Sequence, residues 1–494
     1  MTAAPVLLAG CAWVVVCDDA ATVLRDHDVL LLDGAIAALA PAPSDPTAHS
    51  PVRERAVALG AATIDARRRL VMPGLVNLHT HTPMTLLRGL AEDVDLQGFL
   101  ERVWAAEGAV MDAPTVELGA RLGALEALRG GTTCAADMYF HHRSAHVGAV
   151  AVGLRHVGGP TFFDMPGPDG LSWDRRLADL ARWPGELAEI GGPETPQCVA
   201  PHSTYLVSPA HLRDLADVVR GWRRPLLHTH VSENLAENAQ VKHQQGRTPT
   251  RVLSDAGVLD GSFPVVFGHG VHLDPNDVAV AVAAGATVAH CPGSNLKLAS
   301  GALPWAAYRE AGLRRGIGTD GCSSSNDLDM WVAMRLAALL ARLTAGRPDA
   351  AAAAEIVRAV TLDGARGLGM GDLIGSVEAG KRADLVLLDL DAPHLTPVHD
   401  PHALLVYAAG RGDVVDVFVD GERVVADRRS TRLDEADLLA RCRERGATAA
   451  EAAAGAQAVR ADAGVQAVRA DGSASAAPLA GSGSMAPPAE DAAP

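Results

Sequence analysis

Six histidines and one aspartate stand directly after short apolar runs of the kind that form buried strands. They lie in the segments His-Thr-His (79–81), Pro-His-Ser (201–203), His-Thr-His (228–230), Gly-His-Gly (268–270) and Thr-Asp-Gly (319–321). Imidazole and carboxylate groups bind metal ions and also transfer protons. With 19 histidines in 494 residues, a His-x-His pair arises by chance roughly 0.7 times, so the two pairs alone decide little. The joint arrangement over five strand ends is what predicts a catalytic metal site.

The spacing of the first pair suits two ligands of one ion. Residues two apart on a strand point to the same face, so His79 and His81 can bind one cation together. Either His228 or His230 supplies a third imidazole, and we favour His230. Asp320 is the candidate carboxylate ligand. This set suits one Zn²⁺ per chain with an open position for water, and Fe²⁺ or another divalent ion is an alternative.

Glu233 is the candidate proton shuttle, and it is the reason for preferring His230 as the third ligand. It follows His230 by three residues, so its carboxyl group can lie beside a metal-bound water. Zinc lowers the pKa of bound water from 15.7 to about 7. Attack on an amidine-like carbon then needs a group that carries a proton to a ring nitrogen and to the leaving amine. The alternative is that Glu233 is a carboxylate stabilised by the dipole at the start of a helix. That interpretation would be the better one only if no histidine lay beside Glu233 in the sequence.

The segments between these motifs alternate between strand-like and helix-like patterns. Apolar runs predict eight strands, at 71–78, 132–138, 150–154, 197–200, 225–227, 265–267, 286–289 and 315–318. Helices are predicted between most of them, at 114–128, 209–221, 275–284 and 304–311, each with a proline at its start. This order is typical of an α/β protein with a (β/α)8 TIM barrel, whose active site lies at the carboxyl ends of the strands. A doubly wound open sheet has the same periodicity, so the pattern alone leaves both folds open.

Strand-rich stretches at both ends of the chain predict a small β-sandwich domain. Short runs at 12–17, 29–32 and 35–39 precede the barrel segment, and similar runs at 383–390, 414–419 and 423–425 follow it. The predicted domains are therefore 1–66 and 375–440 for the β-sandwich and 67–374 for the barrel. Residues 448–494 are nearly all Ala, Gly, Ser, Pro and Asp, and we expect them to form a disordered tail that catalysis does not need.

Composition argues against several classes of function. Asp and Glu number 59 against 43 Lys and Arg, a formal charge of −16, so we expect neither a nucleic-acid partner nor an anionic membrane partner. Hydrophobic residues make up 48% of the chain, but the apolar run near the N-terminus is far too short to span a bilayer. The seven cysteines are dispersed and form no Cys-x-x-Cys pair, so we expect no disulfide framework and a cytoplasmic location.

Longer motifs surround the chemistry-bearing residues. They are Pro-Gly-Leu-Val-Asn-Leu-His-Thr-His (73–81), Met-Thr-Leu-Leu-Arg-Gly (84–89), His-Val-Ser-Glu (230–233), Ser-Asn-Leu-Lys-Leu-Ala-Ser-Gly (294–301), Gly-Thr-Asp-Gly (318–321) and Gly-Lys-Arg-Ala-Asp-Leu-Val (380–386). Over residues 73–421 the chain resembles the amidohydrolase superfamily, in the branch of methylthioadenosine/S-adenosylhomocysteine deaminases and related chlorohydrolases. The resemblance implies the TIM barrel rather than the open sheet, and it implies a homo-oligomer.

The resemblance also implies roles for individual residues. The implied metal ligands are His79, His81, His230 and Asp320. Glu233 resembles the proton shuttle, and His269 resembles the group that orients the water together with Asp320. His202 resembles the residue that contacts the purine ring. Glu107 resembles the carboxylate that binds the ribose 2′- and 3′-hydroxyls, although without the resemblance it could equally be a solvated residue on a helix face.

The predicted activity is hydrolytic deamination of an adenosine-like nucleoside, which releases ammonia and the inosine analogue. The predicted substrates are 5′-deoxyadenosine, methylthioadenosine, adenosine or a compound of the S-adenosylhomocysteine type. Members that act on S-adenosylhomocysteine are expected to present an arginine to its amino-acid carboxylate. This chain has Pro160 at that place and Arg155 earlier, which favours a smaller or uncharged 5′ group. The alternatives are a deaminase or chlorohydrolase of a free heterocycle (a guanine, pterin or s-triazine) and, more remotely, a non-catalytic barrel scaffold.

Overall fold

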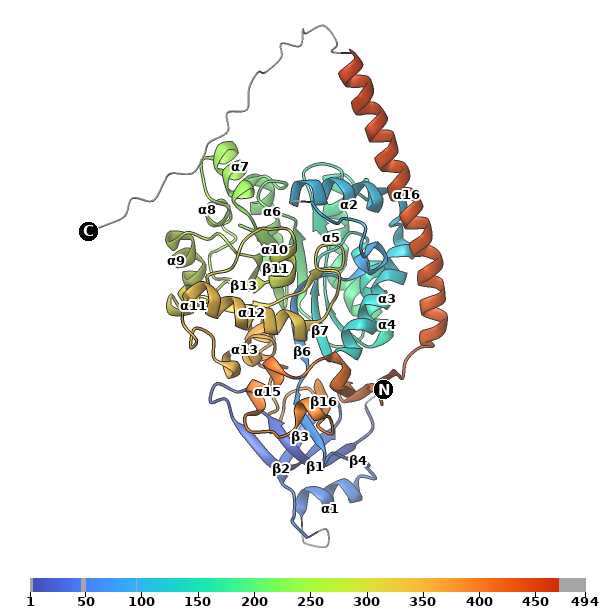
Figure 1. The fold of residues 1–494 in the computed structure, drawn as a ribbon, viewed down its shortest axis with the longest axis vertical. Coiled ribbons are helices and arrows are strands. Elements are labelled where there is room, and N and C mark those ends of the chain that lie inside the picture. The colour runs from blue at the N-terminus through green and yellow to red at the C-terminus, as the bar shows by residue number, and fades with distance from the viewer. Residues whose placement is uncertain (1–2, 46–49, 95, 471–494) are drawn as a thin grey trace, which may run out of the picture. The chain divides into compact units, whose positions relative to one another are not determined.

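The computed structural model describes residues 3–45, 50–94 and 96–470. The chain divides into two compact units, Met1–Ala453 and Ala454–Pro494. The first unit contains two parallel sheets, one mixed sheet and the helices packed on them (Figure 1). Within the described ranges, no helix is both long enough and apolar enough to cross a membrane.

Most of the residues that could do chemistry lie on, or directly after, strands of the two parallel sheets. The six-stranded sheet has the order β14-β13-β12-β11-β10-β9, with bounds Arg314–Ile317, Thr287–His290, Val265–His269, Pro225–Val231, Gln197–Pro201 and Thr161–Phe162. The four-stranded sheet has the order β15-β6-β7-β8, with bounds Asp320–Gly321, Leu75–His81, Thr132–Asp137 and Arg155–Val157. The fold is therefore an α/β fold with parallel sheets, similar to a TIM barrel.

Helices cover these sheets and bury apolar faces against them. Their bounds are α3 Ala113–Arg129, α4 His142–Val152, α5 Trp173–Ile190, α6 Pro209–Arg220, α7 Leu235–Gln245, α8 Pro249–Asp255, α9 Pro275–Ala283, α10 Pro292–Lys297, α11 Trp305–Glu310, α12 Met330–Ala345, α13 Ala353–Ala359 and α14 Leu362–Gly367. The four predicted helices correspond to α3, α6, α9 and α11. Asp112 caps α3 by accepting a hydrogen bond from the Thr115 amide, and a proline in the first turn follows, which is how the sequence sets the start of this helix.

The predicted third strand, 150–154, is wrong. Helix α4 runs to Val152, and β8 begins only at Arg155. Gly153 ends the helix in the left-handed region, with φ of 104°. A short apolar run fits the buried face of a helix as well as it fits a strand, and here Ala149 and Val152 belong to that face.

The predicted first strand, 71–78, is divided at Gly74. Residues Arg69–Pro73 form β5 of the mixed sheet, whereas Leu75–His81 form β6 of the parallel sheet. A Cβ atom at Gly74 would lie 2.0 Å from Oγ1 of Thr133, so only glycine fits where the chain passes from one sheet to the other.

The nine-stranded mixed sheet takes strands from both ends of the chain. Its order is β19-β18-β17-β16-β5-β1-β2-β3, with β4 paired to β1. The early strands are β1 Val6–Val15, β2 Val23–Leu32, β3 Ala35–Pro41 and β4 Ala62–Asp65. The late strands are β16 Leu385–Asp389, β17 Val414–Val419, β18 Glu422–Ala426 and β19 Arg429–Ser430. The two sets meet where β5 pairs antiparallel with β16.

Within its described residues, the first unit also contains helices α1, α2 and α15 and three 3-10 helices. They are α1 Pro51–Ala58, α2 Leu96–Val110, α15 Pro401–Tyr407 and the 3-10 helices η1 Thr82–Leu87, η2 Pro393–Leu395 and η3 Arg411–Asp413. Among these elements, helix α2 and Met84 of η1 line the cavity of the candidate site.

The segment predicted to be a disordered tail begins as a helix. Helix α16 covers Glu435–Ala470 and so includes residues 448–470 of this segment, whereas residues 471–494 lie outside the described residues. The segment lacks large apolar residues, but alanine has the highest helix propensity, so a helix can form without a core of its own. Ala449 is 1% exposed and belongs to the apolar cluster that contains Leu96 and Phe99.

Two truncations test where the C-terminal segment stops contributing to stability. We expect deletion of residues 448–494 to lower the free energy of unfolding by about 1 kcal/mol, because it removes the buried methyl group of Ala449. Deletion of residues 454–494 should leave stability unchanged, and both chains should keep full turnover at 25 °C. Thermal unfolding of the two truncated proteins beside the full chain measures this difference. Equal melting temperatures for the two truncations would contradict it.

Candidate active site

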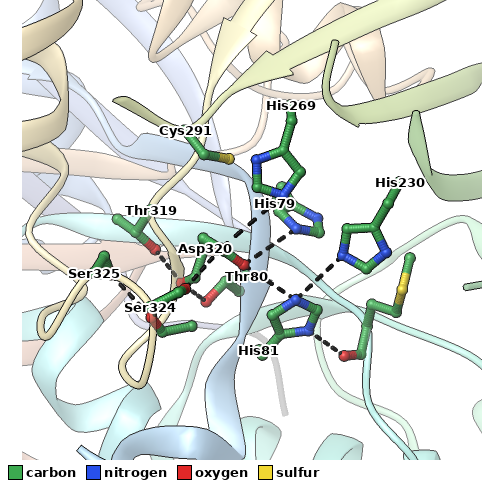
Figure 2. Close-up of polar contacts among 12 residues, drawn as sticks. His79, Thr80, His81, His230, His269, Cys291, Thr319, Asp320, Ser324 and Ser325 are labelled. Atoms are coloured by element: carbon green, nitrogen blue, oxygen red, sulfur yellow. Dashed lines mark hydrogen bonds and ion pairs between the residues drawn. The ribbon is translucent and has the colours of Figure 1, made fainter. Parts of the chain in front are cut away.

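Strand ends from both parallel sheets bring four imidazoles and a carboxylate together (Figure 2). Strand β6 carries His79 and His81, β11 carries His230, β12 ends at His269 and β15 begins at Asp320. Oδ1 of Asp320 lies 3.1 Å from Nε2 of His81 and 3.4 Å from Nε2 of His79. Nε2 of His230 lies 3.4 Å from Nε2 of His81. The four predicted ligands therefore lie around one centre, with His269 beside them.

Hydrogen bonds on the outer side of these rings leave their Nε2 atoms facing the centre. Nδ1 of His81 donates to the carbonyl oxygen of Met138 over 2.6 Å, and Nδ1 of His230 donates to that of His202 over 2.7 Å. Nε2 of His79 is buried, and apart from its 3.4 Å contact with Oδ1 of Asp320 it has no polar partner among the described residues. An imidazole that donates through Nδ1 carries its lone pair on Nε2, the form that binds a metal ion. The residues present therefore fit a divalent cation.

His228, the alternative third ligand, lies behind the centre rather than in it. Its Nε2 is 2.8 Å from Nδ1 of His79, and the two rings meet edge to face. His228 thus orients His79, in the way that backbone carbonyls orient the other two rings. The structure places His230, and not His228, against His81.

Burial and the single carboxylate set the charges in the cluster. Burial lowers the pKa of His79 to about 4 and that of His230 well below its usual value. Burial also acts to lower the pKa of His81, but the hydrogen bond and charge of Asp320 outweigh it and raise that pKa to about 9. For Asp320 burial acts to raise the pKa, and the hydrogen bonds from His79 and His81 reverse this and hold it well below its usual range. Asp320 is therefore an anion at neutral pH, as a metal ligand must be.

Glu233 and His269 are buried next to this cluster. Oε2 of Glu233 lies 3.6 Å from Nε2 of His269, which in turn lies 4.0 Å from Oδ2 of Asp320. Nδ1 of His269 donates to Oδ1 of Asn295 over 2.9 Å, so the ring is held with Nε2 toward the two carboxylates. Burial raises the pKa of Glu233, and the nearby charge of His269 partly opposes this. A carboxyl group with a raised pKa both accepts and donates a proton more readily near neutral pH.

Glu237 holds the loop that carries Glu233, and sequence reasoning did not identify it. Its carboxylate accepts hydrogen bonds from the amides of Ser232 (3.0 Å) and Glu233 (2.7 Å). Ser232 has φ of 52°, a left-handed conformation that a residue other than glycine rarely adopts. In the sequence, Glu237 is marked only by its position four residues after Glu233. Asn295 was missed as well, and within its motif nothing in the sequence marks it as the partner of His269.

We expect Glu237→Ala to lower kcat by about 100-fold, because an error of about 1 Å in the position of Glu233 is enough for such a loss. Glu237→Gln keeps one acceptor oxygen and should recover part of the activity. Steady-state kinetics with metal analysis of each variant measures the effect. Unchanged kcat in Glu237→Ala, or a loss of bound metal in proportion to the loss of activity, would contradict a role in positioning Glu233.

Three members of the cluster, His81, His230 and Asp320, line a cavity that is also lined by Glu107 and His202. Glu107, on α2, is 2% exposed and accepts a hydrogen bond from the Tyr139 hydroxyl over 2.6 Å. Burial raises the pKa of Glu107 to about 7. The alternative interpretation of Glu107 as a solvated residue is therefore wrong. Burial lowers the pKa of His202 to about 3, and its ring lies 5.2 Å from that of Phe163, so it is a neutral ring in an aromatic wall.

Arg155 does not reach the cavity. Its guanidinium group is fully buried and forms ion pairs with Asp384 at 2.8 Å and Asp420 at 2.5 Å. These carboxylates flank the mixed sheet, so Arg155 joins β8 to that sheet. Neither Arg155 nor Pro160 is among the described residues that line the cavity.

Comparison with known proteins agrees with the geometry of the site. The model of the amidohydrolase family matches residues 70–424. The chain belongs to the amidohydrolase family. The resemblance drawn from the sequence is thereby confirmed, and the matched region of this amidohydrolase contains the whole cluster with Glu107, His202, Glu233 and His269.

Similar sequences have related names. A 5-methylthioadenosine/S-adenosylhomocysteine deaminase of Symbiobacterium thermophilum is 41% identical over 399 residues, which covers 78% of this chain and 88% of that protein. A protein of the same name from Halobacterium salinarum is 39% identical over 398 residues, which covers 80% of this chain and 90% of that protein.

Two zinc-containing crystal structures have the same fold. An adenosine deaminase from Xanthomonas campestris with bound zinc has a TM-score of 0.82 and 36% identity, and covers 90% of this chain and 98% of its own. An atrazine chlorohydrolase from Arthrobacter aurescens TC1 in complex with zinc has a TM-score of 0.78 and 25% identity, and covers 89% of this chain and 100% of its own.

Proposed function

We propose that this amidohydrolase is a metal-dependent deaminase that hydrolyses the C6–N bond of an adenosine-like nucleoside. The observation that carries the proposal is that His81, His230, Asp320 and Glu233 line the same cavity as Glu107 and His202. The first four residues suit hydrolysis, and the other two suit a purine nucleoside. The names of the relatives, deaminases of adenosine and of its 5′-thio derivatives, support the same activity.

Nε2 of His79, His81 and His230 and the carboxylate of Asp320 would hold one zinc ion per chain. The donor set is the nitrogen and oxygen set that zinc prefers, and Fe²⁺ is an alternative with the same ligands. The zinc in two similar structures supports the choice. When bound, zinc supplies a hydroxide nucleophile at neutral pH, because it lowers the pKa of water to about 7.

The chain's own residues move the protons. Water oxygen forms a bond to C6, one proton ends on ring nitrogen N1, and the other leaves with the amino group as ammonia. Glu233 takes the proton from water and delivers it to N1, and then assists the protonation of the leaving amine. His269, fixed by Asn295, directs Nε2 toward Glu233 and Asp320 and orients the attacking water. The products are ammonia and the inosine analogue, so the atoms balance.

Glu107 and His202 would recognise the nucleoside. An ionised carboxylate accepts two hydrogen bonds from the neighbouring 2′- and 3′-hydroxyls of ribose. The Tyr139 hydroxyl contacts Oε1 of Glu107 and fixes the orientation of the carboxylate. His202 is uncharged and tilted against Phe163, so it offers the purine a polar edge within an aromatic wall.

The finer architecture belongs to the same proposal. The two parallel sheets would be parts of one closed (β/α)8 barrel over 67–374, and the mixed sheet would belong to a β-sandwich over 1–66 and 375–440. Support comes from β15, which pairs with β6 and follows β14 after only Gly318 and Thr319. The homo-oligomer stays a prediction, and the exposed Leu339 and Leu343 on α12 support it. The cytoplasmic location also stays a prediction, and the described cysteines, all of which are free, support it.

A screen for ammonia release tests the function. The substrates are adenosine, 5′-deoxyadenosine and methylthioadenosine, with guanine, a pterin and an s-triazine as free-heterocycle controls. We expect turnover of the nucleosides and none of the free heterocycles. Turnover of a free heterocycle with every nucleoside inert would overturn the proposal in favour of a heterocycle deaminase or chlorohydrolase. A metal-loaded protein that turns over nothing in the screen would favour the scaffold.

A further inference from the structure

One face of helix α2 forms an apolar wall of the cavity. Leu96, Phe99, Leu100 and Val103 all line it, and their spacing of three and four residues places them on the same side of the helix. Glu107 lies on the same face, one turn after Val103. A nucleoside held through its ribose at Glu107 therefore has this wall within reach of its 5′ carbon, because a helix rises 1.5 Å per residue.

Lysine and arginine side chains are missing from the described part of the cavity wall. Among its described lining residues there is no lysine and no arginine, and the acidic ones are Glu107, Glu233 and Asp320. Each of these three already has a role at the ribose, in proton transfer or in the metal cluster. A ligand carboxylate placed here would meet carboxylates rather than a counter-charge.

Arg176 lies behind the Thr161 and Phe163 side of the cavity, and Asp169 neutralises its charge. Its guanidinium group lies over the ring of Phe163 and donates to the carbonyl oxygen of Thr161 over 2.9 Å, and both of these residues line the cavity. Nη2 of Arg176 also contacts Oδ1 of Asp169 at 2.5 Å, with 3% of the Arg176 side chain and 1% of the Asp169 side chain exposed. The pair contributes no net charge, and Arg155 is paired elsewhere.

From these walls we propose that the enzyme acts on adenosine derivatives whose 5′ substituent is uncharged, and discriminates against those that carry an amino-acid group. The inference rests on the proposed function and narrows its substrate class. A homocysteine-like 5′ group would place a carboxylate in the cavity with no lysine or arginine to pair with it, and removing an unpaired charge from water is strongly unfavourable. An alkyl or alkylthio group loses nothing by the transfer and gains burial against α2.

The wild-type enzyme tests this with four substrates. Methylthioadenosine is compared with S-adenosylhomocysteine, with a 5′-butylthio derivative of matched length and no charge, and with 5′-deoxyadenosine. We expect kcat/KM for S-adenosylhomocysteine to be lower than for methylthioadenosine by about 100-fold or more, which corresponds to leaving a buried charge unpaired. The butylthio derivative should stay within about 10-fold of methylthioadenosine.

The outcomes separate this inference from the proposed function. Equal kcat/KM for methylthioadenosine and S-adenosylhomocysteine leaves the deaminase intact and overturns the inference. A butylthio derivative with a kcat/KM as low as that of S-adenosylhomocysteine also overturns the inference, because the cavity then discriminates by the length of the 5′ group and not by its charge. No ammonia from any of the four substrates means that the proposed function itself has failed.

A variant pair tests whether the α2 wall is responsible. Leu100→Arg adds a cation to a half-buried position of the wall, and Leu100→Gln is the uncharged polar control. We expect Leu100→Arg to raise the ratio of kcat/KM for S-adenosylhomocysteine to that for methylthioadenosine by about 10-fold over Leu100→Gln. Equal ratios in the two variants would show that the absence of a cation on this wall does not set the preference.

Discussion

Replacing Glu233 by glutamine is expected to reduce kcat by about 10³–10⁴-fold, the contribution of a positioned acid–base group. Glutamine keeps the shape of the side chain and its place beside His269 but cannot carry a proton. Because Glu233 is not among the proposed metal ligands, bound metal per chain should stay at the wild-type value. Ammonia release and metal analysis on the same preparation measure both quantities.

A matched change on the surface controls for the loss of a negative charge. Glu310 is exposed on α11, away from the cavity, and Glu310→Gln should keep wild-type kcat. If Glu233→Gln retains more than about a tenth of wild-type kcat, another group carries the protons, and the assignment of Glu233 is wrong.

Glu107→Ala should lower kcat/KM for adenosine nucleosides by at least about 100-fold, because it removes two hydrogen bonds to a charged acceptor, each worth about 1.5–3 kcal/mol. The effect should disappear with 2′,3′-dideoxyadenosine, which offers no hydroxyl groups to Glu107. Steady-state kinetics on the two substrates gives the comparison. A similar loss on the dideoxy substrate would mean that Glu107 acts through the shape of the cavity and not through ribose.

The pH dependence of the wild type gives a second measure of Glu107. Burial raises its pKa to about 7, so the carboxylate that accepts both hydroxyls is present above that pH and is lost as the pH falls through it. KM for ribonucleosides should therefore rise below about pH 7, whereas KM for the dideoxy substrate should not show this rise.

The parts of the site that follow from local sequence could be predicted. His79 and His81 face one centre because alternate residues on a strand share a face, and Asp320 meets them because parallel strands end at the same edge. The choice of His230 over His228 followed from Glu233, and the structure places His230 against His81.

Other features depend on packing between distant segments and could not be predicted. Asn295 and His269 are 26 residues apart in the sequence, and nothing in the residues around either one indicates that they are hydrogen-bonded. The run at 150–154 contains the end of a helix, with Val152 on the buried face of α4 and Gly153 as its C-cap, which hydrophobicity alone does not reveal. In the C-terminal segment, the burial of Ala449 in a distant apolar cluster could not be predicted either, because the composition there is of low complexity and names no partner.

Metal content is the most direct test of the claim that strand ends far apart in the chain form one metal site. After removal of metal and repletion with zinc, the wild type should bind about one equivalent per chain, and His230→Ala should bind less than about a tenth of an equivalent. His228→Ala, the matched control on the same strand, should retain most of its zinc. A wild type that binds only a small fraction of an equivalent, or zinc lost in His228→Ala and kept in His230→Ala, would contradict the account.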